Sequence, residues 1–167
     1  MRNIVLIGFM GCGKTTLGRF ISTNKGYKFV DTDDIIVEKQ GRSINDIFAM
    51  EGEAYFRQLE TDTIKEMLGS VSDTVISVGG GLPVREENQG LLRELGLCVY
   101  LRTSKEELVR RLKDDTSRPL LAGGDIEKKI EELMSKRKDI YESTAELIID
   151  TDGLNRVQIV NTIMERI

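Results

Sequence analysis

The amino-acid sequence predicts an α/β fold, a three-layer sandwich in which helices cover both faces of a five-stranded parallel sheet. The first observation behind this prediction is that short apolar runs alternate with segments of helical periodicity along all 167 residues, as in βαβ units. The second is that the first apolar run leads directly into a glycine-rich segment of the kind that joins a strand to a helix. No repeat or long linker interrupts this pattern, so we expect a single domain over residues 1–167.

Each expected strand is a short apolar run that a helical pattern separates from the next. The five runs are Ile4–Ile7, Lys28–Val30, Thr74–Val78, Leu97–Leu101 and Glu146–Ile149. Ligands of parallel sheets bind beyond the carboxyl ends of the strands. A site is therefore expected in the segments that directly follow the runs, which are residues 8–16, 31–34, 79–81, 102–104 and 150–153.

The segment after the first run, residues 8–16 (GFMGCGKTT), has the P-loop pattern of a glycine, four residues and then Gly-Lys-Thr. Its glycines allow successive backbone N–H groups to point inward at phosphate oxygens, beside the positive end of the following helix. Lys14 can reach the β- and γ-phosphates, and the Thr15 hydroxyl can ligate Mg²⁺. The segment predicts a nucleoside triphosphate site.

Three aspartates, at positions 31, 33 and 34, follow the second run. One interpretation is structural, because Asp33 or Asp34 can cap a helix over Ile35–Gln40. The other is catalytic, because three carboxylates beside a P-loop repel a nucleotide unless Mg²⁺ or a proton intervenes. On this interpretation one carboxylate helps to hold Mg²⁺ through water, and another orients or deprotonates an acceptor hydroxyl.

Two further features bear on this acidic cluster. The third run ends in Gly79-Gly80-Gly81 and not in the aspartate of many P-loop enzymes, so Asp31 is the candidate for the metal side. A glycine turn at the end of a strand suits a backbone that approaches a ligand closely. The chain contains no histidine, so a general base must be a carboxylate, a lysine or a tyrosine.

The second half of the site is less clear from spacing alone. A long helical insert, with a helix over Glu53–Leu68, separates the second and third runs, and inserts of this kind commonly carry a specificity pocket. Within it, the spacing of Arg57 and Glu60 favours a surface ion pair. Arg118 lies in a loop that Pro119 and two glycines punctuate, which suggests a lid that closes on a transferring phosphoryl group. Arg137 belongs to a strongly charged helix and is interpreted as a solvated charge.

Composition excludes some classes of function. The net charge of −4 gives no reason to expect nucleic-acid binding. No apolar run approaches the ~20 residues that span a bilayer, and the first run begins so early that we expect no signal peptide. Cys12 and Cys98 have no CxxC neighbour and are expected to be reduced thiols. Together with the expected absence of a signal peptide, this predicts a cytoplasmic protein. No long apolar surface stripe is evident, so we expect a monomer.

At this point the chain resembles the shikimate kinase family over essentially its whole length. The P-loop alone would indicate only a superfamily, whereas the full set of motifs, in this order, is highly specific. The matching motifs are Gly8-Phe9-Met10-Gly11-Cys12-Gly13-Lys14-Thr15, Asp31-Thr32-Asp33, Tyr55-Phe56-Arg57 with Glu60, Gly79-Gly80-Gly81, Arg118-Pro119-Leu120-Leu121, and Arg137 four residues before Tyr141.

The resemblance implies a P-loop kinase fold of the nucleoside-monophosphate-kinase-like type, with strand order 2-3-1-4-5. It also implies ATP- and Mg²⁺-dependent phosphorylation of the 3-hydroxyl of shikimate, on the pathway to chorismate and aromatic amino acids. By position it divides the chain into a core with the P-loop, a substrate-binding insert at about residues 33–61 and a lid at about residues 113–124.

The resemblance also assigns roles to individual residues. Asp33 would be the base or only a positioning group, and either Arg110 or Arg111 would flank adenine, with the spacing from Arg118 favouring Arg111. The implied catalytic residues are Lys14, Asp33 and Arg118. The implied ATP-binding residues are Gly11, Cys12, Gly13, Lys14, Thr15, Thr16, Arg111, Arg118 and Asn155. The implied substrate-binding residues are Asp33, Arg57, Glu60, Gly79, Gly80, Gly81 and Arg137, and the implied metal-side residues are Thr15 and Asp31.

Four rival interpretations share parts of this pattern. A kinase for another small polyol, such as gluconate, would share the fold and P-loop but would not need the Asp-Thr-Asp motif with Arg57 and Arg137. A nucleoside-monophosphate kinase would need a pocket for a base and a phosphate, whereas two arginines and an aspartate suit a hydroxy acid better. A GTP switch would need Asn-Lys-x-Asp, whereas the only Asn-Lys, at 24–25, is followed by Gly-Tyr. A non-catalytic module would bind ATP without acceptor-dependent turnover.

Overall fold

The computed structural model describes residues 1–167 and contains one five-stranded sheet in the order β2-β3-β1-β4-β5. All four neighbouring strand pairs are parallel, which confirms the α/β prediction and the implied strand order. The strands are β1 (Ile4–Ile7), β2 (Lys28–Asp31), β3 (Thr74–Ser77), β4 (Leu97–Arg102) and β5 (Leu147–Asp150).

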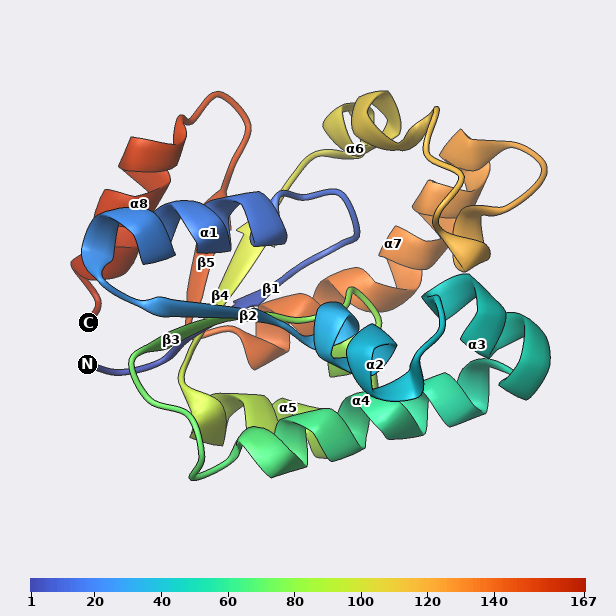
Figure 1. The fold of residues 1–167 in the computed structure, drawn as a ribbon. Coiled ribbons are helices and arrows are strands. Elements are labelled where there is room, and N and C mark those ends of the chain that lie inside the picture. Colours follow the sequence, from blue (N-terminus) through green and yellow to red (C-terminus); the bar gives the residue numbers. More distant parts are fainter.

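Helices cover the sheet on both faces, with α1 and α8 on one side and α4, α5 and α7 on the other (Figure 1). No helix is long and apolar enough to cross a membrane. The helices are α1 (Lys14–Lys25), α2 (Thr32–Gln40), α3 (Ile44–Glu51), α4 (Glu53–Met67), α5 (Glu86–Leu95), α6 (Lys105–Leu112), α7 (Ile126–Thr144) and α8 (Arg156–Met164). Two single 3₁₀ turns, η1 (Leu82–Val84) and η2 (Pro119–Leu121), complete the set.

The central strand explains where the site lies. All residues of β1 are fully buried, as expected for a strand that helices cover on both faces. Within the sheet, β2 and β3 lie on one side of β1, and β4 and β5 lie on the other. The strand order therefore reverses at β1. Ligands of open α/β sheets bind outside the carboxyl ends of the strands at such a point, and residues 8–13 lie there.

The start of α2 differs from the prediction. The helix begins at Thr32 and not near Ile35, and its N-cap is Asp31, whose Oδ1 accepts a hydrogen bond of 2.9 Å from the Asp33 N–H. The prediction that Asp33 or Asp34 caps the helix is therefore wrong. Because Asp31 satisfies the free backbone donor at the helix start, the Asp33 side chain is available for another role.

Candidate active site

The P-loop wraps around the side chain of Lys14. Gly11 and Gly13 have φ angles of 79° and 97°, a left-handed conformation that glycine adopts without a steric penalty. Lys14 is only 8% exposed, and its Nζ donates hydrogen bonds to the carbonyls of Gly8 (2.8 Å) and Phe9 (3.0 Å). The loop therefore holds one positive charge at the carboxyl end of β1, among its own backbone groups.

An oxygen cluster lies beside the P-loop at the ends of β2 and β3. The Thr15 hydroxyl donates a 2.7 Å hydrogen bond to Asp31 Oδ2 and lies 3.5 Å from the Ser77 hydroxyl. Asp31 thus has two tasks, because its other carboxylate oxygen caps α2. These residues line the same cleft as Lys14 and Gly13, which we call the phosphate cleft.

A second cleft adjoins the outer side of the P-loop and contains Arg111 and Asn155. Arg111 Nη1 donates to the Gly11 carbonyl (3.0 Å), whereas Arg110 is exposed and pairs only with Glu107. The structure therefore brings Arg111, and not Arg110, to the P-loop. The Asn155 side chain caps α8 by accepting from a backbone N–H. This outer cleft also includes Cys12, Gly13, Thr16, Leu154 and Thr151.

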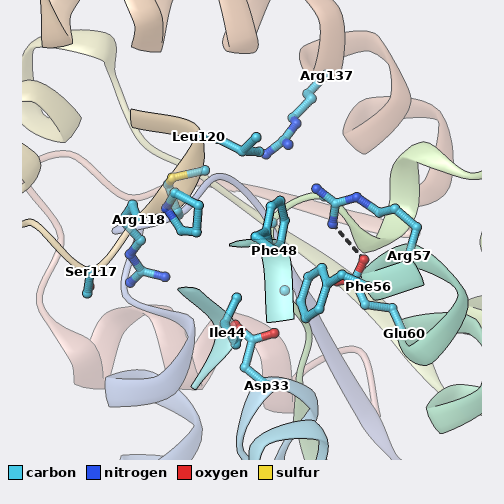
Figure 2. Close-up of a pocket in the computed structure, with 15 residues that line it drawn as sticks. Asp33, Ile44, Phe48, Phe56, Arg57, Glu60, Ser117, Arg118, Leu120 and Arg137 are labelled. Carbon is cyan, nitrogen blue, oxygen red and sulfur yellow. Dashed lines mark hydrogen bonds and ion pairs between the residues drawn. The ribbon is translucent and has the colours of Figure 1, made fainter. Parts of the chain in front are cut away.

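On the other side of the phosphate cleft lies a pocket into which three arginines and two carboxylates project (Figure 2). We call it the arginine pocket. Asp33, Gly79, Gly80, Met10 and Arg118 line both it and the phosphate cleft, so the two spaces are continuous. The other lining residues are Ile44, Phe48, Phe56, Arg57, Glu60, Gly81, Ser117, Pro119, Leu120 and Arg137.

Arg57 and Glu60 form a buried ion pair, so their interpretation as a surface pair is wrong. The Arg57 Nη1 and Glu60 Oε1 atoms are 2.6 Å apart, and the Glu60 side chain is fully buried. Arg57 also contacts the exposed Glu53, one helical turn earlier. The pair is buried because α4 packs this face toward the glycine turn after β3. Glu60 therefore holds the Arg57 guanidinium at the edge of the arginine pocket.

Arg137 also differs from its interpretation as a solvated charge. Its side chain is only 5% exposed, although the adjacent Lys136 and Lys138 are exposed. The guanidinium carbon lies 5.9 Å from the centre of the Phe9 ring, and Nη1 is buried without a hydrogen-bond partner. A buried arginine nitrogen without a partner is rare. This one projects into the arginine pocket (Figure 2), where an anion would satisfy it.

Two carboxylate oxygens also lack partners. Asp33 Oδ1 and Glu60 Oε2 are buried and unpaired, and both lie within 3 Å of the position that a side chain at Gly79 would occupy. Burial, reinforced by the charge of Asp31, raises the pKa of Asp33 to about 6. Burial raises the pKa of Glu60 to about 7, although the Arg57 guanidinium opposes this rise. The pKa values of both carboxylates in the pocket are therefore closer to neutral pH than those of an ordinary aspartate or glutamate.

We expect the raised pKa of Asp33 to make stability depend on pH. A folded-state pKa of about 6 against an ordinary value of 3.8 gives a contribution that is present below about pH 4 and lost as the pH rises through about 6. Between pH 4 and pH 8, wild type should lose about 2 kcal/mol of unfolding free energy relative to Asp33→Asn. Urea unfolding at both pH values measures this, with Asp34→Asn as control. Parallel losses in wild type and Asp33→Asn would contradict the prediction.

The glycine turn is crowded by side chains and not strained in its backbone. A Cβ at Gly79 would lie 2.8 Å from Glu60 Oε2 and 2.9 Å from Asp33 Oδ1, and one at Gly81 would overlap the Arg57 guanidinium. None of the three glycines has a φ in the left-handed region. The absence of side chains at the turn therefore leaves room for the charged groups of the arginine pocket.

Arg118 lies in the predicted lid, where the chain enters η2. Its side chain is 38% exposed and contacts Asp115, with Nε 3.4 Å from Oδ2. Leu121 is buried against the core and attaches the segment to the rest of the molecule. Arg118 borders both the phosphate cleft and the arginine pocket, so it stands where a phosphoryl group would pass between them.

Several residues of the site had no predicted role. Met10, Ile44, Phe48 and Leu120 form apolar parts of the arginine pocket, and Ser77 lies beside Thr15. Ser77 is the last residue of β3, at the sheet edge where ligands bind, so its position was a usable signal. The apolar residues gave no signal of their own, because an apolar side chain is far more often part of a core.

The fold and the two continuous spaces define a phosphotransferase of the P-loop kinase class, with an anion-binding pocket beside the nucleotide site. Comparison with known proteins agrees with this. The model of the family described as shikimate kinase matches residues 10–167. The chain belongs to the shikimate kinase family, whose members are kinases with an alcohol group as acceptor.

Individual relatives are similar over nearly the full length. A shikimate kinase of Persephonella marina is 45% identical over 167 residues, which cover 100% of this chain and 99% of the relative. One of Geobacter sulfurreducens is 45% identical over 162 residues, covering 97% of this chain and 88% of the relative. The structure of Acinetobacter baumannii shikimate kinase in complex with shikimate superposes with a TM-score of 0.94, at 35% identity, covering 99% of this chain and 92% of that chain.

Proposed function

We propose that this chain transfers the γ-phosphoryl group of ATP to the 3-hydroxyl of shikimate, giving shikimate 3-phosphate and ADP. The observation that carries the proposal is the continuity of the P-loop cleft with a pocket that combines unpaired arginine and carboxylate groups. Shikimate has one carboxylate and three hydroxyls, which require a cation and hydrogen-bond acceptors respectively. The family of the chain supports the same substrate.

In the proposed complex, the arginines bind the carboxylate of shikimate. Guanidinium groups match a carboxylate with paired, charge-assisted hydrogen bonds. Arg137 has a free buried nitrogen for this purpose, and Glu60 keeps Arg57 in place. The glycine turn forms the adjoining wall, and the rings of Phe48 and Phe56 lie at the apolar side (Figure 2).

Asp33 receives the acceptor hydroxyl on the side of the pocket that faces the P-loop. As the acceptor oxygen bonds to the γ-phosphorus and the bond to the β-phosphate oxygen breaks, the hydroxyl proton passes to the Asp33 carboxylate. A pKa of about 6 leaves most of the carboxylate ionised at neutral pH and is closer to the working pH than an ordinary aspartate. Lys14 and Arg118 neutralise charge on the transferring group, which matters more than base strength when the transition state is loose.

Mg²⁺ fits the oxygen cluster of the phosphate cleft. Thr15 and Asp31 supply a hydroxyl and a carboxylate, the hard oxygen donors that Mg²⁺ prefers. No group of three or more His, Cys, Asp or Glu side chains placed to hold a metal is present, and Mg²⁺ in kinases is bound by few protein oxygens together with phosphates and water. When bound, it would neutralise phosphate charge.

We further propose the division of the chain that the resemblance implied. The segment of about residues 33–61 acts as the substrate-binding insert, and the segment of about residues 113–124 acts as a lid. Both segments border the arginine pocket. Arg111 and Asn155 flank the adenine in the outer cleft, which Cys12 and Thr16 also line. We propose that the enzyme works as a cytoplasmic monomer and binds no nucleic acid.

Release of ADP in the presence of ATP and Mg²⁺ tests the proposed function. The assay is run with shikimate, with gluconate, with AMP and without an acceptor. We expect turnover with shikimate only, because gluconate lacks the ring that fills the apolar side of the pocket. Turnover with gluconate in its place would keep the fold and the P-loop site but overturn the proposed acceptor. ATP binding with no turnover on any acceptor would indicate a non-catalytic module.

Arg137→Ala should chiefly weaken shikimate binding. A hydrogen bond to a charged group contributes about 1.5–3 kcal/mol, so KM for shikimate should rise about 10- to 150-fold while KM for ATP stays close to wild type. Lys138→Ala is the matched control, because it removes one positive charge from the neighbouring, exposed position of α7. Steady-state kinetics with each substrate varied in turn measure the effect. An unchanged KM for shikimate would remove Arg137 from the binding site.

A further inference from the structure

The glycine turn after β3 is fixed by buried side chains that lie outside the proposed substrate contacts. The Thr32 hydroxyl at the start of α2 accepts a 3.1 Å hydrogen bond from the Gly79 N–H. The Asn88 amide of α5 donates a 2.9 Å hydrogen bond to the Leu82 carbonyl. Thr32 and Asn88 are at most 1% exposed. Both ends of the turn are therefore attached to neighbouring helices.

The middle of the turn is held by Tyr141 of α7. Its hydroxyl donates a hydrogen bond to the Gly80 carbonyl, and its side chain is fully buried, one helical turn beyond Arg137. Burial raises the pKa of Tyr141 well above its ordinary value, so the hydroxyl keeps its proton and acts as a donor at neutral pH. Its ring packs against Tyr100, with 5.1 Å between ring centres.

This hydrogen bond fixes the orientation of a peptide group that borders the arginine pocket. The peptide between Gly80 and Gly81 is trans and planar, so its N–H points in the opposite direction to its C=O. Because Tyr141 binds the C=O, the Gly81 N–H faces away from the tyrosine. Neither Gly80 nor Gly81 donates a backbone hydrogen bond within the chain, and both line the pocket.

We propose that Tyr141 is a positioning residue of the acceptor site, whose hydroxyl holds the Gly80–Gly81 peptide so that its N–H stays directed at the acceptor. The inference rests on the proposed function, because the acceptor is taken to be shikimate. The groups on either side of Gly80 make its orientation important. A Cβ there would lie 3.1 Å from the Met10 backbone nitrogen and 3.5 Å from Arg137 Nη1, so this peptide separates the P-loop from the anion-binding arginine.

The test is Tyr141→Phe, with Tyr100→Phe as the matched control. Both changes remove one hydroxyl from the same ring pair, and Tyr100 borders a separate cleft with Arg102 and Asp150. We expect Tyr141→Phe to raise both KM for shikimate and the Kd for shikimate without nucleotide, measured by calorimetry, by about tenfold. KM for ATP should stay at the wild-type value. Tyr100→Phe should change none of these constants.

The outcomes separate this inference from the proposed function. If Tyr141→Phe matched Tyr100→Phe in its shikimate constants, the positioning role would be overturned while the function stood. A parallel rise in KM for both substrates would also overturn it, because that is the result of general loosening of the fold. If wild type showed no shikimate-dependent turnover, the proposed function would fail, and this inference would fail with it.

Discussion

Asp33→Asn is expected to lower kcat by about 10²- to 10⁴-fold while leaving ATP binding close to wild type. The asparagine keeps the size of the side chain but cannot accept the hydroxyl proton. It also replaces a buried oxygen that has no partner in the free protein, so the variant should fold normally. Steady-state turnover with saturating shikimate, together with the Kd for ATP, measures the two effects separately.

Asp34→Asn is the control for this substitution. Asp34 lies next to Asp33 in the first turn of α2 but is exposed, and its removal changes the local charge by the same amount. We expect near-normal turnover from the control. In wild type, kcat/KM should fall as the pH is lowered through about 6, where Asp33 becomes protonated. Normal turnover by Asp33→Asn would remove Asp33 from the mechanism. A fall in kcat/KM through about pH 6 that is the same in Asp33→Asn as in wild type would also remove it.

Lys14→Met is the second substitution with a large expected effect, a loss of about 10²- to 10³-fold in kcat. Lys14 is the buried positive charge inside the P-loop, and methionine fills similar space without it. In the free protein its ammonium group donates hydrogen bonds to two P-loop carbonyls and, at 3.7 Å, to the Cys12 sulfur. None of these partners is a carboxylate, so the ammonium is available to phosphate oxygens when a nucleotide enters. KM for ATP should rise as well, because the charge also acts on bound nucleotide.

Lys25→Met is the control for Lys14→Met. Lys25 is the exposed last residue of the same helix, at the end that faces away from the P-loop. The same change in charge and side chain should leave kcat and KM for ATP at wild-type values. If both variants kept wild-type kcat, the proposal that the P-loop lysine acts on the transferring phosphoryl group would be contradicted.

The parts of the fold that the residues predicted are those with local causes. The alternation of apolar runs and helical patterns predicted the five strands with bounds close to those observed, since β1 spans Ile4–Ile7 as expected and β4 ends one residue later, at Arg102. The P-loop pattern predicted a loop between a strand and a helix, and Lys14 is indeed the first residue of α1 after the loop that follows β1. The strand order is not a local property, and it came from the family resemblance.

The residues that spacing misjudged are charged groups whose burial depends on tertiary packing. Glu60 follows Phe56 by four residues and precedes Ile64 by four, so it occupies the buried stripe of α4. Arg137 shares the buried stripe of α7 with Ile130 and Tyr141. A charged residue within an apolar stripe was a signal in both cases. Spacing from an oppositely charged neighbour, which was used for Glu60, reports only on an isolated helix.

The helix start at Asp31 shows a different limit. Any of the three neighbouring aspartates can act as an N-cap, and the choice depends on where β2 ends against β3. Because the sheet extends β2 to Asp31, that residue becomes the cap and also contacts Thr15, which leaves Asp33 for the arginine pocket. The sequence alone contains no information on this competition.

Identification of the phosphorylated product tests the central claim most directly. The chain is incubated with ATP, Mg²⁺ and shikimate, and the product is examined by ³¹P and ¹H NMR. We expect ADP and a single phosphate monoester on the 3-hydroxyl of shikimate, because Asp33 and the P-loop approach the acceptor from the same side. Inorganic phosphate in place of the ester, or an ester on another hydroxyl, would contradict the arrangement of acceptor, Asp33 and P-loop proposed above.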